Sequence, residues 1–188
     1  MEADWAVEVG ADLPSIDVPW EGFIDLRCDP GAVVNIAEAV SSAALQQALI
    51  TLNSNDSPVY TSKCDLWMLA TSEIDPDEFG AQAADAVIGC ASYIDVLLRD
   101  PKRLSSFEFY ERWVRDLALQ MRRQILSNGR VDLALRPAQV DSSSGYGLTL
   151  YAAGCGADAP SAEAAWQAVL LVATATTMSL STSHGMGE

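Results

Sequence analysis

The chain has 188 residues, 49% of them apolar, and its 11 basic and 26 acidic side chains give a net charge of −15. A surface this acidic repels phosphate backbones and anionic bilayers, so we expect neither nucleic acid nor membrane as a partner. A basic protein or a cation would be attracted. The length and apolar content predict one domain over residues 1–180 that buries its own core, followed by a flexible polar tail over 181–188.

Several features together predict a cytoplasmic protein with reduced thiols. Residues 1–10 contain no basic residue and no long apolar run, unlike a signal peptide. The apolar run over residues 165–180 is shorter than the roughly 20 residues that a membrane span needs. The four cysteines are far apart in the sequence and form no CxxC pair.

The predicted elements of the first half alternate between strands and helices. Residues 4–10 predict an edge strand, and the alternating residues 20–28 predict the first strand of the main sheet. A helix follows over 29–53, with Asp29 as its N-cap and Pro30 in its first turn. A second strand over 57–69, an acidic loop over 70–85 and a third strand over 86–100 complete this half.

The second half predicts two helices and two strands. The clearest helix covers 104–129, with a capping box of Ser105 and Glu108 and a stop at Asn128-Gly129. Strands over 130–137 and 146–153 follow, joined by a hairpin-type link, and the last helix covers 158–178.

The order of these elements predicts the fold class. From residue 20 they read β-α-β-β-α-β and then β-α, and the first six match the split βαβ, ferredoxin-like arrangement. We therefore predict an α+β fold with an antiparallel sheet, helices on one face, and an extra C-terminal strand and helix. Such a fold leaves the other face of the sheet uncovered and implies no function by itself.

An aspartate stands between two apolar or thiol-bearing residues in each of the four main strands, although aspartate is depleted in strands. Because side chains alternate along a strand, all four point to the uncovered face if their neighbours face the helices. Basic and aromatic residues of the same parity share that face. The candidate ligand or interface residues are Asp25, Arg27, Lys63, Asp65, Trp67, Tyr93, Asp95, Arg130 and Asp132.

The cysteines are interpreted as structural. Cys28, Cys64 and Cys90 have the parity of the apolar strand residues, so we expect them in the core, where burial raises the pKa of a thiol and makes it inert. Cys155, between two glycines at a strand-to-helix turn, is expected to be a loop cysteine. His184, the only histidine, lies in the predicted tail, which argues against histidine-based catalysis or metal binding.

Three uses of the uncovered face remain open: a solvated surface, a homodimer interface, and a ligand or active site. The sequence favours a non-catalytic binding or interaction protein, homodimeric through its charged and aromatic sheet face. One alternative is a small enzyme that uses the aspartates of this face, with or without a divalent cation. Another is an acidic protein that neutralises a basic partner. No catalytic residue, cofactor or metal site is assigned.

Overall fold

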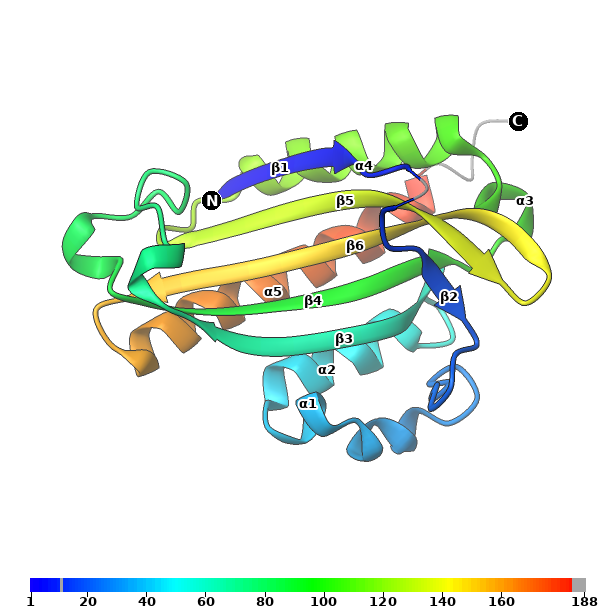
Figure 1. Ribbon diagram of the computed structural model, residues 1–188, viewed down its shortest axis with the longest axis horizontal. Helices are drawn as coiled ribbons and strands as arrows, with labels where there is room; N and C mark the ends of the chain where they lie inside the picture. The colour runs from blue at the N-terminus through cyan, green and yellow to red at the C-terminus, as the bar shows by residue number, and fades with distance from the viewer. Residues whose placement is uncertain (11, 184–188) are drawn as a thin grey trace.

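The computed structural model describes residues 1–10 and 12–183 and has an α+β architecture, as predicted. It consists of a mixed six-stranded sheet with helices packed on one face (Figure 1). The strands are β1 (Glu2–Val7), β2 (Ile16–Val18), β3 (Val59–Leu69), β4 (Ile88–Leu98), β5 (Gly129–Val140) and β6 (Ser143–Gly156).

The strand order is β1-β5-β6-β4-β3, and β2 also pairs with β5. The four long strands β3 to β6 pair with one another in antiparallel fashion. The short strands β1 and β2 are parallel to β5, with β1 along residues 130–135 and β2 along 138–140. This mixed pairing does not confirm the split βαβ arrangement expected from the element order.

The difference starts at residues 20–28, where the expected strand is wrong. This segment consists of turns and irregular backbone. The Asp25 carboxylate accepts hydrogen bonds from the backbone N–H of Arg27 at 3.0 Å and from its Nε at 2.8 Å. Such local bonds compete with the ladder of a sheet. The Arg27 guanidinium also lies 4.0 Å from the centre of the Tyr60 ring, which holds the turn against β3.

The helices pack side by side on one face of the sheet, behind it in Figure 1. The central helix α5 (Ala159–Ser183) lies along β6 and β4, with α4 (Phe107–Arg122) beside β1 and β5 and α2 (Ala43–Asn53) beside β3. The shorter helices are η1 (Pro30–Asn35), α1 (Ala37–Val40), η2 (Thr71–Glu73), η3 (Ala83–Asp85) and α3 (Pro101–Leu104).

Helix boundaries differ from the expected ones where a better cap is present. The expected helix over 29–53 is interrupted, and Ser42 caps α2 by accepting from the N–H of Leu45. The N-cap of α4 is Ser106, and this helix ends at Arg122, so Ile125 of the predicted apolar stripe is fully exposed. Helix α5 includes residues 181–183 of the predicted tail, and residues 184–188 lie outside the described residues.

The main core lies between the sheet and the helices. Strand residues of one parity, such as Ile94, Leu133 and Leu150, pack against Trp113 of α4 and Trp166 of α5. The indole N–H of Trp166 donates to the buried Ser92 hydroxyl of β4 at 2.9 Å. The strand residues of the other parity therefore point to the opposite, helix-free face of the sheet.

Two smaller apolar clusters cover the ends of the helix-free face. At one end β2 packs over Leu97 and Tyr60, and Ser62 of β3 donates to the carbonyl of Asp17 at 3.2 Å. At the other end, residues 70–87 place Ile74 and Phe79 over Cys155. Between these ends the face stays open, and we call this stretch the trough; it is lined by Asp65, Trp67, Tyr93, Arg130, Asp132 and Tyr151.

Candidate functional site

One row of cross-strand neighbours runs across the trough and the adjoining edge strand. Asp65 of β3 lies opposite Tyr93 of β4, which lies opposite Tyr151 of β6. Tyr151 lies opposite Asp132 of β5, and Asp132 opposite Asp4 of β1. Directly opposite residues project from the same face of a sheet. The structure therefore places two of the candidate aspartates on one face, separated by two tyrosine rings.

The remaining candidates divide into two groups. Asp95 lies on the same face, in a neighbouring row opposite Thr149, and Trp67 and Lys63 share the parity of Asp65 on β3. Asp25 and Arg27 are not part of this face, because the strand that was to present them is a turn. They form an ion pair of 2.7 Å with each other instead.

Three half-buried aromatic rings form a continuous run over β3, β4 and β6. The ring centres of Trp67 and Tyr93 are 6.3 Å apart, and those of Tyr93 and Tyr151 are 5.9 Å apart, both with tilted planes. Burial, with the nearby charges of Asp95 and Asp65, raises the pKa of Tyr93 to about 12. Tyr93 therefore remains a neutral phenol at physiological pH.

Five basic side chains lie over other aromatic rings. Lys63 lies over Trp20, Arg136 over Tyr151, and further arginines over Tyr60, Phe109 and Trp5. Within residues 1–10 and 12–183, no basic side chain lies over Trp67 or Tyr93. These two rings are thus free of an internal cation, beside the carboxylate of Asp65.

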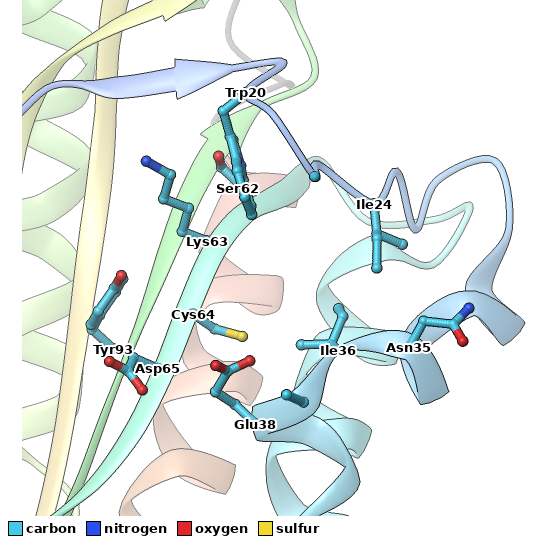
Figure 2. Close-up of a pocket in the computed structure, with 12 residues that line it drawn as sticks. Trp20, Ile24, Asn35, Ile36, Glu38, Ser62, Lys63, Cys64, Asp65 and Tyr93 are labelled. Atoms are coloured by element: carbon cyan, nitrogen blue, oxygen red, sulfur yellow. The ribbon is translucent and has the colours of Figure 1, made fainter.

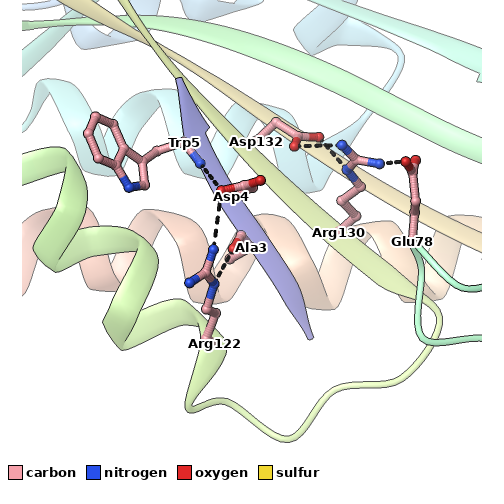
Figure 3. A network of polar contacts seen from close by, with 7 residues as sticks. All are labelled: Ala3, Asp4, Trp5, Glu78, Arg122, Arg130 and Asp132. Atoms are coloured by element: carbon pink, nitrogen blue, oxygen red, sulfur yellow. Dashed lines mark hydrogen bonds and ion pairs between the residues drawn. The ribbon is translucent and has the colours of Figure 1, made fainter. Parts of the chain in front are cut away.

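Arg130 is bound by two carboxylates at one end of the trough (Figure 3). Its Nε donates to Asp132 at 2.6 Å, and its Nη1 pairs with Glu78 from the acidic loop. The side-chain hydrogen bond to Asp132 is the largest contribution that raises the pKa of Arg130. Figure 3 also shows Arg122 of α4 bonded to Asp4 at the edge of β1.

Arg136 is held in a similar way further along β5. It pairs with Glu8 at 2.6 Å and donates to the Tyr151 hydroxyl at 3.0 Å. Arg130 and Arg136 are therefore both neutralised by carboxylates of the same chain. Asp65 has no ion pair among the described residues, so the carboxylate beside the free rings is available to an external cation.

Asp95 is a nearly buried carboxyl group on the same face. It is 6% exposed, and the hydroxyl of Thr149 donates to it at 2.6 Å. Burial raises its pKa, opposed by the Thr149 bond and by the charges of Arg136 and Lys63. Its charged form is therefore less favourable in the folded protein than in the unfolded chain.

We expect Asp95→Asn to stabilise the protein at neutral pH by more than the roughly 0.5 kcal/mol within which most surface substitutions fall, because burial makes the charged form of Asp95 unfavourable in the folded protein. The asparagine still accepts from Thr149 but has no charge to bury. Because the folded-state pKa is raised, the wild type regains this stability as the pH falls and Asp95 is protonated. Urea unfolding at neutral and acidic pH should therefore show a difference that shrinks on acidification.

The exposed Asp56, in the turn between α2 and β3, provides the control. Asp56→Asn makes the same change in net charge and should alter stability by no more than about 0.5 kcal/mol. If the stability gained by Asp95→Asn does not change with pH, the buried charge of Asp95 is not its cause.

A pocket of about 450 Å³ adjoins the trough along β3 (Figure 2). Asp65 and Tyr93 line it on the trough side of the strand, and Figure 2 shows Cys64 and Glu38 on the other side. Burial, reinforced by the charges of Glu38 and Asp65, raises the pKa of the Cys64 thiol to about 12. Cys64 therefore stays protonated at neutral pH, which disfavours a role as a nucleophile.

The other cysteines lie in three different environments. Cys90 is buried, and burial raises its pKa to about 11. Cys155 is also buried, at the end of β6 rather than in a loop. Cys28 is exposed, so its expected place in the core is wrong; it depended on the strand that is absent at 20–28.

The described part of the chain holds no group of three or more His, Cys, Asp or Glu side chains placed to bind a metal ion. In the trough, the strand register keeps the carboxylates apart, because Tyr93 and Tyr151 lie between Asp65 and Asp132. Among the same residues, no helix combines the length and the hydrophobicity that a membrane crossing requires.

Several residues of the site were not among the candidates from the sequence, including Glu8, Trp20, Glu38 and Glu78. Glu8 and Asp4 have the same parity in the expected edge strand. This parity would have indicated that Glu8 faces the trough side, had the strand been placed beside β5. Trp20, Glu38 and Glu78 come from turns and a short helix, for which alternation gives no orientation. Their positions depend on how these segments fold back onto β3 and β5.

Comparison of the chain with protein-family models, with curated proteins and with solved structures found no match.

Proposed function

We propose that this is a non-catalytic binding protein that holds a basic segment of a partner protein in the trough. The observation that supports this most strongly is the pair of rings Trp67 and Tyr93, which no internal cation covers, beside the unpaired carboxylate of Asp65. A lysine or arginine side chain over an aromatic ring is favoured by about 0.5–2 kcal/mol, depending on how far it is desolvated. The overall charge of −15 adds attraction at long range.

The shape of the trough supports a narrow ligand. The β2 segment and residues 70–87 cover the two ends of the face, which confines a ligand to the open stretch between them. An extended side chain or peptide fits between them. The adjoining pocket of about 450 Å³, with Glu38 on its far wall, extends the acidic surface along β3.

The test is a calorimetric titration with a short peptide of alternating lysine and arginine. Asp65→Asn is expected to weaken binding by about three- to tenfold, the loss of one ion pair with partial desolvation. Asp56→Asn, with the same net charge but outside the trough, should retain nearly wild-type affinity. Equal losses in the two variants would show that only the overall charge attracts the peptide.

Self-association through the trough remains a second prediction. Light scattering distinguishes a monomer of 20.1 kDa from a dimer. If a dimer forms and Tyr93→Asp dissociates it, the trough binds another copy of this chain rather than a foreign basic segment.

One observation favours the enzymatic alternative, the raised pKa of Asp95 close to Tyr93. A carboxyl group that remains protonated to higher pH can act as a general acid. A panel of chromogenic ester, phosphate and glycoside substrates tests this, with Asp95→Asn as the matched inactive variant. Activity that Asp95→Asn leaves unchanged would assign no catalytic role to this carboxyl group.

A further inference from the structure

The sheet ends at β3 with an edge that has no strand beside it. β3 is the last strand in the order β1-β5-β6-β4-β3, and among the described residues it pairs with β4 alone (Figure 1). The first half of the edge is covered, because Thr61 bonds to a side chain of α2 and Ser62 bonds to the β2 segment. From Cys64 to Leu69, no hydrogen bond of the described residues joins the backbone to a segment other than β4.

The pairing of β3 with β4 shows which backbone groups of β3 point outward. In an antiparallel pair, every second residue directs its N–H and C=O to the partner strand. The N–H of Arg99 donates to the Pro58 carbonyl at 2.9 Å, so β4 residues an even number of positions from Arg99 face β3. Tyr93 is one of them, and it lies opposite Asp65. Asp65 and Trp67 therefore bond to β4, whereas the backbone groups of the residues between them point away.

Cys64, Leu66 and Met68 thus present N–H and C=O groups along the free edge. The N–H of Leu66 agrees with this direction, since it donates to the carboxylate of Asp65 in the same strand at 2.7 Å. An unpaired edge of this kind is a template for another strand. The side chains of these three residues point to the helix side, where Cys64 and Leu66 are half-buried and Met68 is 50% exposed. An added strand would cover them.

A cavity leaves room for another segment beside this edge. The cavity of about 450 Å³ has residues 62–65 of β3 as one wall and residues of the 20–38 segment as the other. Figure 2 shows the apolar side chains of Ile24 and Ile36 across the cavity from Cys64. Along this stretch, the neighbouring segment is therefore separated from the edge of β3 instead of packed against it.

Acidic side chains lie on both sides of the edge. Asp65 is on the trough side and Glu38 on the helix side, and neither forms an ion pair among the described residues. Lys63, the basic residue of the cavity wall, lies over Trp20 with its Nζ 5.3 Å from the ring centre. A second copy of β3 would bring Asp65 towards its own counterpart, and like charges on neighbouring strands are destabilising. A basic segment has the complementary charge.

We propose that the basic segment of the partner protein pairs with the β3 edge as an added antiparallel strand. This inference rests on the proposed function, and it assigns the backbone of the segment to the edge and its cationic side chains to the trough. Residues opposite Asp65 and Trp67 lie on the trough side, where a lysine or arginine meets the carboxylate and the ring. Residues between them lie against Leu66 and Met68 and are apolar. The partner segment therefore alternates basic and apolar residues.

The test uses a short peptide in which lysine or arginine alternates with leucine, together with two N-methylated forms of it. In the added strand the leucines lie opposite Leu66 and Met68 and direct their N–H groups to β3. N-methylation of the leucines removes these donors, and calorimetry should show a loss of affinity of about 10- to 100-fold, the range for a few hydrogen bonds. N-methylation of the basic residues, whose N–H groups point to solvent, should keep the affinity within about threefold.

Met68→Pro tests the same pairing from the side of the protein. It removes an N–H that points away from β4, so the bonds between β3 and β4 remain and the protein should fold, as circular dichroism would show. The alternating peptide should bind about tenfold more weakly, because one donor is lost and the proline ring obstructs the added strand. Met68→Ala keeps the N–H and is the control, with affinity within about threefold of the wild type.

Equal affinities of the two N-methylated peptides, or wild-type affinity in Met68→Pro, would overturn the proposed pairing. If Asp65→Asn still weakens binding of the unmethylated peptide in that case, side chains alone hold the basic segment and the proposed function stands. If the unmethylated peptide does not bind at all, both are rejected. A dimer that Met68→Pro dissociates, without binding of the peptide, would assign the edge to a second copy of the chain.

Discussion

Gly154→Ala is expected to destabilise the protein by about 3 kcal/mol or more, the upper end of the range for forcing extra volume into a packed core. A methyl group at Gly154 would lie 2.1 Å from the backbone nitrogen of Trp166 and 2.6 Å from the carbonyl carbon of Ala165. These are backbone atoms of α5, so no side-chain rotation relieves the clash. The helix would have to move away from β6.

Such a movement would disturb the helix layer beyond residue 154. Trp166 is completely buried, and its indole N–H would move away from the Ser92 hydroxyl. Urea denaturation followed by circular dichroism measures the loss. Gly10→Ala is the control, because the nearest atom to its added methyl group is 3.5 Å away, and it should change stability by no more than about 0.5 kcal/mol. Equal stabilities would mean that α5 can shift without cost.

The double variant Trp67→Leu/Tyr93→Leu is expected to weaken binding of the lysine-arginine peptide by about 10- to 100-fold. This loss corresponds to two cation–π contacts of roughly 1 kcal/mol each, plus the lost packing area. The net charge of the protein does not change, so the long-range attraction is preserved. Titration at low and high salt separates the two effects, because salt screens the long-range part more strongly.

Met68 provides the control for the ring substitutions. It is the next residue of β3, so its side chain points to the opposite face, and it is half exposed. Met68→Leu should bind the peptide like the wild type. If the double variant also keeps wild-type affinity, the peptide does not contact the rings, and the proposed mode of binding is rejected.

The sequence was most informative within single elements. Alternation in residues 57–69, 86–100, 130–137 and 146–153 predicted the four long strands. The same alternation indicated which side Asp65, Asp95 and Asp132 take, because side-chain direction in a strand follows from local backbone geometry. Asp25 stands in the same alternating pattern, but the structure has a turn there instead of the predicted strand. Its hydrogen bonds to Arg27 are an alternative to strand pairing that alternation does not detect.

The site was less predictable than the strands that form it. The row from Asp65 to Asp132 requires the order β3-β4-β6-β5 and the register of each pair, and neither is encoded in any one segment. The carboxylates that neutralise Arg130 and Arg136 come from Glu78 and Glu8, far away in the sequence. This spatial arrangement leaves Trp67 and Tyr93 without a basic side chain over their rings among the described residues.

By itself, the sequence determined the acidic charge, the α+β class and the long strands. It also determined which residues of each strand lie together on one face. These properties follow from composition and from side-chain periodicity over a few neighbouring residues. The tertiary structure alone decided that β1 and β2 pair in parallel with β5, that the ends of the open face are covered, and that α5 lies against Gly154. The physical reason is that strand partners and close contacts are selected by packing between distant segments, for which a local pattern contains no signal.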